Sequence, residues 1–141
     1  MSGGFFPVPG TAVPWARAGA VGKRRFTPAK QTNFMGVLQV HAREAMAGRA
    51  PIEGPVELQV MAAYAWPSSW SKKRRADPLE AWKVSRPDAD NLSKLVADAL
   101  NGLAFVDDAQ VVSLHVWKRY ETIPLLAVRV TSLGETLRGS L

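Results

Sequence analysis

Aspartates crowded into a short stretch are the residues of this sequence best suited to chemistry. Five of the 12 acidic residues lie between positions 88 and 108, in a chain whose formal net charge is +6. An amide and an amine accompany them, and the full group is Asp88, Asp90, Asn91, Lys94, Asp98, Asp107 and Asp108. Carboxylates gathered in this way repel one another, so they either bind protons or hold a divalent cation. A hard ion such as Mg²⁺ prefers oxygen ligands, and it would also attract a phosphate group.

Structural roles that need no metal are open to the first members of this group. Asp88 follows a proline where a helix is expected to begin, and aspartate commonly caps such a position. Asp90 could do no more than favour the helix dipole in the first turn. Lys94 is four residues from both Asp90 and Asp98, which is also the spacing of an exposed ion-pair ladder. An Asp-x-Asp pair is therefore a weak signal by itself; glycosyltransferases contain one too, although this chain is too short for their nucleotide-sugar domain.

The second pair of aspartates raises a question of distance. Asp107 and Asp108 could be turn residues that open a strand, and they follow the far end of a helix of about 13 residues, which is about 20 Å long. Residues 101–107 could return along the helix, since a rise of about 3.3 Å per residue covers roughly 20 Å. Leu103 and Phe105 alternate as an apolar return path requires. One chain could thus assemble the cluster, and completion by a partner chain is the alternative.

Two helices are expected to position these side chains. The first spans about 28–47, with Thr27 as its N-cap, proline in its first position and Gly48 after its end. Its predicted inward face is Phe34, Val37, Leu38, His41 and Ala45. The second helix spans about 88–101 and stops at Gly102. Its apolar stripe is Leu92, Leu95, Val96, Ala99 and Leu100.

Four strands are expected beside the helices, at 4–9, 55–66, 109–120 and 125–132. Two prolines confine the first strand to the edge of a sheet. The second strand alternates apolar residues on one face, namely Val56, Leu58, Val60 and Ala62. The third is expected to place on one face Gln110, Val112, Leu114 and Val116. The order strand, helix, strand, helix, strand, strand predicts an α+β fold, with two main helices packed on one side of a mixed β-sheet.

Length and composition indicate one folded unit. A chain of 141 residues suits a single domain, 1–141, with a frayed tail expected at 133–141. Cysteine is absent, which excludes disulfides and thiolate metal sites and suits a reducing cytoplasm. The sequence shows neither an export signal nor an apolar run long enough to span a membrane.

Positive charge favours a polyanionic partner. The isoelectric point is near 10.1, and lysine and arginine gain affinity for nucleic acid by releasing phosphate counterions. A basic hairpin or loop is expected at 15–27 and a longer basic loop at 67–86. The candidate DNA-contacting cations, each of which could also be a solvated surface charge, are Arg24, Arg25, Lys72, Lys73, Arg74, Arg75 and Lys118. Trp70, in the longer loop, could stack on an unpaired base or anchor the loop.

Several motifs together resemble one known family, the RusA-type Holliday junction resolvases, many of which are encoded by phages and prophages. The core of the resemblance is RPDADNLSKLVADALNG, followed by FVDDAQVV and by a lysine in HVWKRY. The flanking segments VPG, RRFTP and WSKKRR are also similar to phage-type members. The combination is far more specific than an Asp-x-Asp pair, and it covers nearly the whole chain.

The resemblance implies a site and a reaction. Asp88, Asp90 and Asp108 would hold one or two Mg²⁺ ions, for which Mn²⁺ could substitute, and Lys94 matches the functionally important lysine of the motif. Asn91 could orient a ligand carboxylate, and Asp107 matches the accompanying acidic position. The implied enzyme is a RusA-like homodimer that binds four-way DNA junctions and nicks two opposed strands. It would work in the cytoplasm of a bacterial or phage-infected cell, with no membrane contact and no small-molecule cofactor.

Two other functions fit the residues. One is a noncatalytic nucleic-acid-binding protein whose acidic group is only structural. The other is a metal-dependent nuclease that prefers flaps, forks or RNA to four-way junctions.

Overall fold

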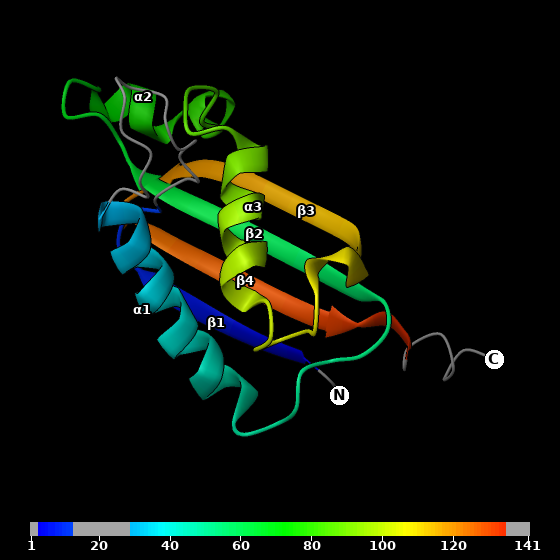
Figure 1. The fold of residues 1–141 in the computed structure, drawn as a ribbon. Coiled ribbons are helices and arrows are strands. Elements are labelled where there is room, and N and C mark those ends of the chain that lie inside the picture. The colour runs from blue at the N-terminus through cyan, green and yellow to red at the C-terminus, as the bar shows by residue number, and fades with distance from the viewer. Residues whose placement is uncertain (1–2, 13–28, 135–141) are drawn as a thin grey trace, which may run out of the picture.

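The fold combines helices with one four-stranded sheet, which confirms the predicted α+β class (Figure 1). The computed structural model describes residues 3–12 and 29–134. The elements in chain order are β1 Gly3–Pro9, α1 Ala29–Met46, β2 Val56–Ala65, α2 Lys72–Ala76, the 3-10 helix η1 Pro78–Glu80, α3 Ala89–Leu100, the 3-10 helix η2 Asp108–Gln110, β3 Val111–Glu121 and β4 Leu125–Ser132. The basic segment predicted at 15–27, with Arg24, Arg25 and the Thr27 cap, lies outside the described residues, as does most of the predicted tail.

The sheet is mixed, and its strand order is β1-β4-β2-β3. β4 pairs antiparallel with both β1 and β2, whereas β3 runs parallel to β2. The predicted alternation along β2 is confirmed, because Val56, Leu58, Val60 and Ala62 are all fully buried. α1 and α3 lie across the face of the sheet to which these side chains point (Figure 1).

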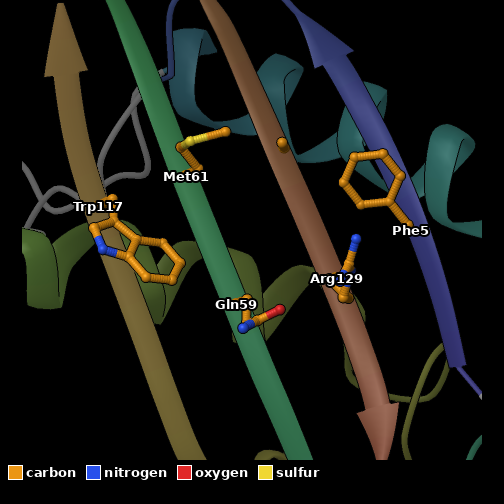
Figure 2. A pocket seen from close by; sticks show the side chains of 6 residues that line it. Phe5, Gln59, Met61, Trp117 and Arg129 are labelled. Carbon is orange, nitrogen blue, oxygen red and sulfur yellow. The ribbon is translucent and has the colours of Figure 1, made fainter.

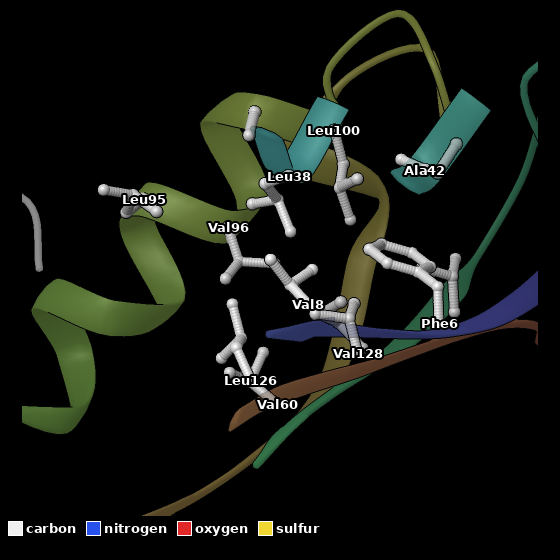
Figure 3. Close-up of a cluster of buried hydrophobic side chains, with 14 of the residues drawn as sticks. Phe6, Val8, Leu38, Ala42, Val60, Leu95, Val96, Leu100, Leu126 and Val128 are labelled. Atoms are coloured by element: carbon white, nitrogen blue, oxygen red, sulfur yellow. The ribbon is translucent and has the colours of Figure 1, made fainter. Parts of the chain in front are cut away.

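α3 belongs to the connection that parallel pairing demands. Two parallel neighbours cannot be joined by a hairpin, so the chain must cross over the sheet between β2 and β3. The predicted stripe of α3 packs on the sheet as expected, since its five members Leu92, Leu95, Val96, Ala99 and Leu100 are buried. Figure 3 shows this contact, with Leu95, Val96 and Leu100 among residues of β1, β4 and α1.

The inward face predicted for α1 is partly wrong. Leu38 is buried and Phe34 and Ala45 are partly so, but Val37 is exposed and His41 is only half-buried. The buried residues are Gln31, Leu38, Ala42 and Met46. Apolar residues occur all round this helix, so its contacts with β1 and α3 decide which side is buried. None of the described helices, α1 included, is both long and apolar enough to cross a membrane.

A β-bulge changes the face predicted for the third strand. Val56 pairs with Val111 but Glu57 pairs with Ser113, so Val112 is an extra residue in β3. Val112 is therefore 65% exposed instead of sharing the inner face with Leu114. Gln110, placed on the same face by the sequence pattern, lies before the strand in η2.

The long basic loop contains two short helical segments. Ser71 caps α2 by accepting a hydrogen bond from the Arg74 amide at 3.1 Å. Asp77 caps η1 in the same way, with the Leu79 amide as donor at 2.9 Å. These two side chains bind backbone amides locally and so divide the loop into short turns. The sequence analysis did not predict the turns, because the loop has no apolar periodicity.

No helix of the described residues covers the second face of the sheet, and Figure 2 shows this face with both helices behind it. Phe5, Met61 and Trp117 line a shallow cavity of about 240 Å³ there. Arg129 contributes to the same surface, and its guanidinium carbon lies 5.2 Å from the centre of the Phe5 ring. Among residues 3–12 and 29–134, helices thus cover only one side of the sheet.

We predict that Phe105→Ala lowers the free energy of unfolding by about 3–5 kcal/mol, because it removes a fully buried ring and leaves a cavity. The matched control is Val106→Ala, at the exposed neighbouring position, which should change stability by about 0.5 kcal/mol or less. Urea denaturation followed by circular dichroism measures both. Similar losses for the two variants would show that Phe105 is not a core residue.

Candidate active site

Asp88 occupies the N-cap position of α3 without serving as a hydrogen-bonding cap. Its backbone is extended, with φ −73° and ψ 146°, yet its side chain makes no capping hydrogen bond. Its carbonyl oxygen accepts from the Leu92 amide at 3.2 Å, so only the backbone of Asp88 starts the helix. The carboxylate is exposed and is not used for the structural role that its position suggested.

Asp90 lies one residue into α3 and is also exposed. One carboxylate oxygen, Oδ1, accepts from the Asn91 amide at 3.0 Å. The Ser93 hydroxyl donates to the Asp90 carbonyl oxygen at 2.9 Å and is buried against the helix. Asp88 and Asp90 thus form an acidic end of α3 at which the helix dipole favours negative charge.

A lysine from β3 holds the segment that leads into this acidic end. The Lys118 ammonium group donates to the carbonyl oxygens of Ser85 at 3.0 Å and of Pro87 at 2.8 Å. Lys83 adds a bond to the Ser85 hydroxyl at 2.9 Å. Lys118, predicted as a DNA contact, therefore has a structural role beside Asp88, and its contact with DNA stays a prediction. A lysine on the helix-facing side of a strand, in phase with Leu114 and Val116, was the sequence signal for such a role.

Lys94 lies one turn further along α3. Its Nζ atom is 4.0 Å from the Asp98 carboxylate, which confirms one rung of the ion-pair ladder. The lysine side chain is more than half exposed, so this pair contributes only a few tenths of a kcal/mol. The pair with Asp98 is thus too weak to prevent the amine from turning toward another anion.

The two aspartates of the second pair have different roles: Asp107 caps η2, and the Asp108 side chain takes no part in the cap. The Asp107 carboxylate accepts from the Ala109 amide at 3.4 Å, and the Asp107 amide donates to the Gln110 side-chain oxygen at 2.8 Å. This reciprocal arrangement is a capping box, so the turn interpretation holds for Asp107. Asp108 is half-buried beside it.

Gln110 is a positioning residue that the sequence interpretation missed. Its side-chain amide donates to the carbonyl oxygens of Ile52 at 2.7 Å and of Gly54 at 2.9 Å. These bonds fix η2 to the chain just before β2. The spacing of Asp107 and Gln110, three residues apart before an apolar strand, was the signal that could have identified the box.

A cavity between α3 and β3 brings Lys94 and Asp108 together. Its volume is about 320 Å³, and its lining residues are Leu58, Ser93, Lys94, Ala97, Asp108, Val111 and Leu114. Asp88 and Asp90 do not line it; Lys94 follows Asp88 by six residues, which is about 9 Å along a helix axis. Within 3–12 and 29–134, three or more acidic or histidine side chains are nowhere grouped so that they could hold a metal ion. The donor atoms suit Mg²⁺, but one chain does not place them as a three-ligand site.

The basic loop has its own set of aromatic contacts. The Arg74 guanidinium lies 3.9 Å from the centre of the Trp70 ring, and that ring packs on Tyr120 with centres 4.8 Å apart. Trp70 therefore anchors the loop, which is one of its two predicted roles. Lys72 and Lys73 are exposed on α2. Trp82, which the sequence interpretation did not select, is 51% exposed.

Comparison with known proteins gives one family match. The profile of the family described as "Endodeoxyribonuclease RusA" matches residues 7–131. A curated relative, the "Uncharacterized protein YqaN" of Bacillus subtilis (strain 168), is 40% identical over 87 residues. That alignment covers 59% of this chain and 61% of the relative, so this chain spans less than two thirds of its length. The family match includes all the candidate site residues.

We predict that Gln110→Ala lowers the free energy of unfolding by about 1–3 kcal/mol, because it removes three hydrogen bonds and leaves two backbone carbonyl oxygens without their donor. Asn33→Ala, which removes an amide at an exposed position of α1, is the control and should lower it by no more than about 0.5 kcal/mol. Urea denaturation gives both values. An unchanged Gln110→Ala protein would mean that η2 is held by other contacts.

Proposed function

We propose, because the chain belongs to the RusA endodeoxyribonuclease family, that it is a Mg²⁺-dependent endonuclease that resolves four-way DNA junctions by paired nicks. The family match over residues 7–131 carries this proposal, since it contains the complete acidic group together with Lys94. The cytoplasm of a bacterial or phage-infected cell is where such a substrate would be met.

The acidic residues are proposed as the ligands of the metal. Asp88 supports this role because its carboxylate is exposed and not used to cap α3. Asp90 and Asp108 supply the other oxygen donors, and Asn91 orients a ligand carboxylate. A bound Mg²⁺, or Mn²⁺ in its place, would polarise the scissile phosphate and lower the pKa of an attacking water.

Lys94 and Asp107 are given different tasks. The Lys94 amine, in the same cavity as Asp108, stabilises negative charge that develops on the phosphate. The Asp107 carboxylate stays with the Ala109 amide and thereby fixes the turn that carries Asp108. Only the first of these two residues therefore contacts DNA in this proposal.

A homodimer is part of the proposal. A single chain does not gather three of its described carboxylates or histidines into a metal site, which favours a site completed by a second chain. Two symmetric copies also supply two active sites for the two opposed cuts. Assembly would then precede metal binding.

The lack of a three-ligand site among the described residues is also compatible with a second function, noncatalytic binding of nucleic acid. A protein that lacks, among its described residues, a preformed three-ligand site could bind nucleic acid through its positive charge without cutting it. An assay for DNA cleavage distinguishes a nuclease from a noncatalytic binding protein. A panel of branched substrates then distinguishes a junction resolvase from a nuclease for flaps or forks.

We predict that Asp90→Asn reduces cutting of a labelled four-way junction at least about 100-fold, because it removes a charged ligand but keeps the shape of the side chain. The assay compares junction, flap, fork, linear duplex and single strand, each with Mg²⁺, Mn²⁺ or EDTA. Native protein should make paired nicks in the junction only when metal is present.

Glu44→Gln, at an exposed position of α1, is the matched control and should cut like native protein. Native protein that binds these substrates tightly but cuts none of them would support the noncatalytic function. Metal-dependent cutting confined to flaps or forks would retain the nuclease and reject the resolvase.

We predict that replacing both Lys72 and Lys73 with glutamine weakens DNA binding and reduces the slope of log affinity against log salt by about 1.8, since each lost phosphate contact on duplex DNA removes about 0.9. Arg43→Gln, in the last turn of α1, should leave the slope unchanged. Fluorescence anisotropy with a labelled junction at several salt concentrations measures this. An unaltered slope in the double variant would exclude α2 from the DNA-binding surface.

A further inference from the structure

In the described part of the chain, seven residues along the outer edge of β3 have no backbone pairing on that side. β3 ends the sheet, and on its outer side the described chain pairs with it only near residues 118–120. There the Lys83 amide donates to the Lys118 carbonyl oxygen and the Tyr120 amide donates to the Ala81 carbonyl oxygen. η2 precedes the strand at its other end, so the open stretch is 111–117.

This open stretch lacks the prolines and charged side chains that protect many edge strands, and the bulge at Val112 interrupts it near one end. Natural edges carry prolines or charged residues that prevent pairing with another strand. The opposite edge, β1, has Pro7 and Pro9. Residues 111–117 read VVSLHVW and contain neither a proline nor a lysine, arginine, aspartate or glutamate. From Ser113 to Trp117 the edge is regular and lacks such residues, so it is suited to receive another strand.

The backbone fixes which groups are offered along this edge. The N–H and C=O of one residue point to the same side of a strand, and successive residues alternate. Because the Lys118 carbonyl and the Tyr120 amide point outward, those of Leu114 and Val116 point outward as well. Leu114 stands at the midpoint of 111–117. A second copy of β3, running antiparallel about a two-fold axis, would therefore exchange both of its Leu114 hydrogen bonds with this one.

That register places like with like on the helix side of the sheet. Leu114 lies opposite the partner's Leu114, and the partner's Val116 lies opposite the bulge at Val112, where the regular alternation of faces ends. Leu114 is 48% exposed and Val112 is 65% exposed in the single chain, which leaves apolar surface beside the cavity that Leu114 lines. Direct apolar neighbours across strands contribute roughly 0.2–1 kcal/mol each, so self-pairing turns this exposed surface into contact.

The same register gives polar complementarity on the open face. The Ser113 hydroxyl donates to the Glu57 carboxylate at 2.9 Å, and the His115 imidazole lies 3.4 Å from that carboxylate. Pairing about Leu114 sets Ser113, with Glu57 beside it, opposite the partner's His115. Each copy thus presents an acceptor to an imidazole of the other, and the two-fold axis repeats the contact. No like charges meet along the seven residues.

We propose that two copies of this chain associate through antiparallel pairing of β3, centred on Leu114, to form one continuous eight-stranded sheet. This inference rests on the proposed two-copy nuclease, for which it supplies the contact surface. The surface adjoins the cavity that Lys94 and Asp108 line, so each copy would cover the open side of the other's cavity at Leu114.

Cysteine cross-linking tests the register directly, because the native chain has no cysteine. Leu114→Cys should form a disulfide-linked dimer under mild oxidation, since opposed residues in a hydrogen-bonded pair have Cα atoms about 5.5 Å apart. Ser113→Cys alone should remain uncross-linked, because its equivalent is a diagonal neighbour at about 7–8 Å. An equimolar mixture of Ser113→Cys and His115→Cys should cross-link as a heterodimer. Val84→Cys, at a 95% exposed position of the basic loop, reports random collision.

A charge at the two-fold axis provides an independent test. Leu114→Lys places two ammonium groups opposite each other and should raise the dimer dissociation constant at least about tenfold in analytical ultracentrifugation. Val84→Lys is the control with unchanged association, and circular dichroism verifies that both variants fold.

The results separate this inference from the proposed function. Failure of Leu114→Cys to cross-link above the Val84→Cys level, or a native protein that sediments as a monomer, overturns the β3 pairing even if native protein cuts junctions with Mg²⁺. Cross-linking in the predicted register supports the pairing even if no substrate is cut, in which case only the nuclease proposal fails. A dimer that cross-links with Ser113→Cys alone has a different register and also overturns the inference.

Discussion

The parallel pairing of β2 with β3 is the constraint on which the rest of the structure depends. Neighbouring parallel strands require the chain to cross the sheet between them, and here the crossover includes the basic loop, α3 and η2. The apolar stripe of α3 attaches this crossover to the sheet. The candidate metal ligands therefore occur at both ends of one connection, with Asp88 and Asp90 at the start of the crossover helix and Asp108 after its end.

This arrangement explains why local side-chain bonds matter so much to the site. Lys118 reaches from β3 to the carbonyl oxygens before Asp88, and Gln110 reaches from η2 to those that precede β2. The Lys118 bonds join the crossover to β3, and the Gln110 bonds join it to the segment just before β2. The aspartates thereby inherit their positions from the sheet, although none of them lies in a strand.

Sequence patterns predicted the helix and the strand whose buried faces follow from their own apolar periodicity. The stripe of α3 and the alternation of β2 are strong periodic signals, and both are buried as expected. The face of α1 was not predictable in this way, since apolar residues surround that helix and tertiary contacts choose among them. The bulge at Val112 arises from pairing with β2 and leaves no mark on the strand's own sequence.

The candidate site was predictable to a similar degree. The aspartates stood out by their number, but their separate roles depend on hydrogen bonds that spacing does not specify. Asp107 became a cap and Asp88 did not, although both precede helical segments. Trp70 was selected because it is aromatic and Lys118 because it is charged. Their contacts with Arg74 and with the Pro87 carbonyl oxygen form only in the folded chain.

The acidic group has to be understood together with the positive charge of the rest of the protein. A protein with a net charge of +6 attracts a polyanion, yet exposed carboxylates at the point of contact would repel the phosphate that must approach them. Two ammonium groups reduce that repulsion: Lys94 lines the same cavity as Asp108, and Lys118 is bonded to the carbonyl oxygen of Pro87, the residue before Asp88. In the proposed nuclease, a divalent cation would supply the remaining positive charge in a form that carboxylates and phosphate can share. Under the proposed function, the acidic group and the basic surface would then act together, the first by holding the cation and the second by attracting DNA.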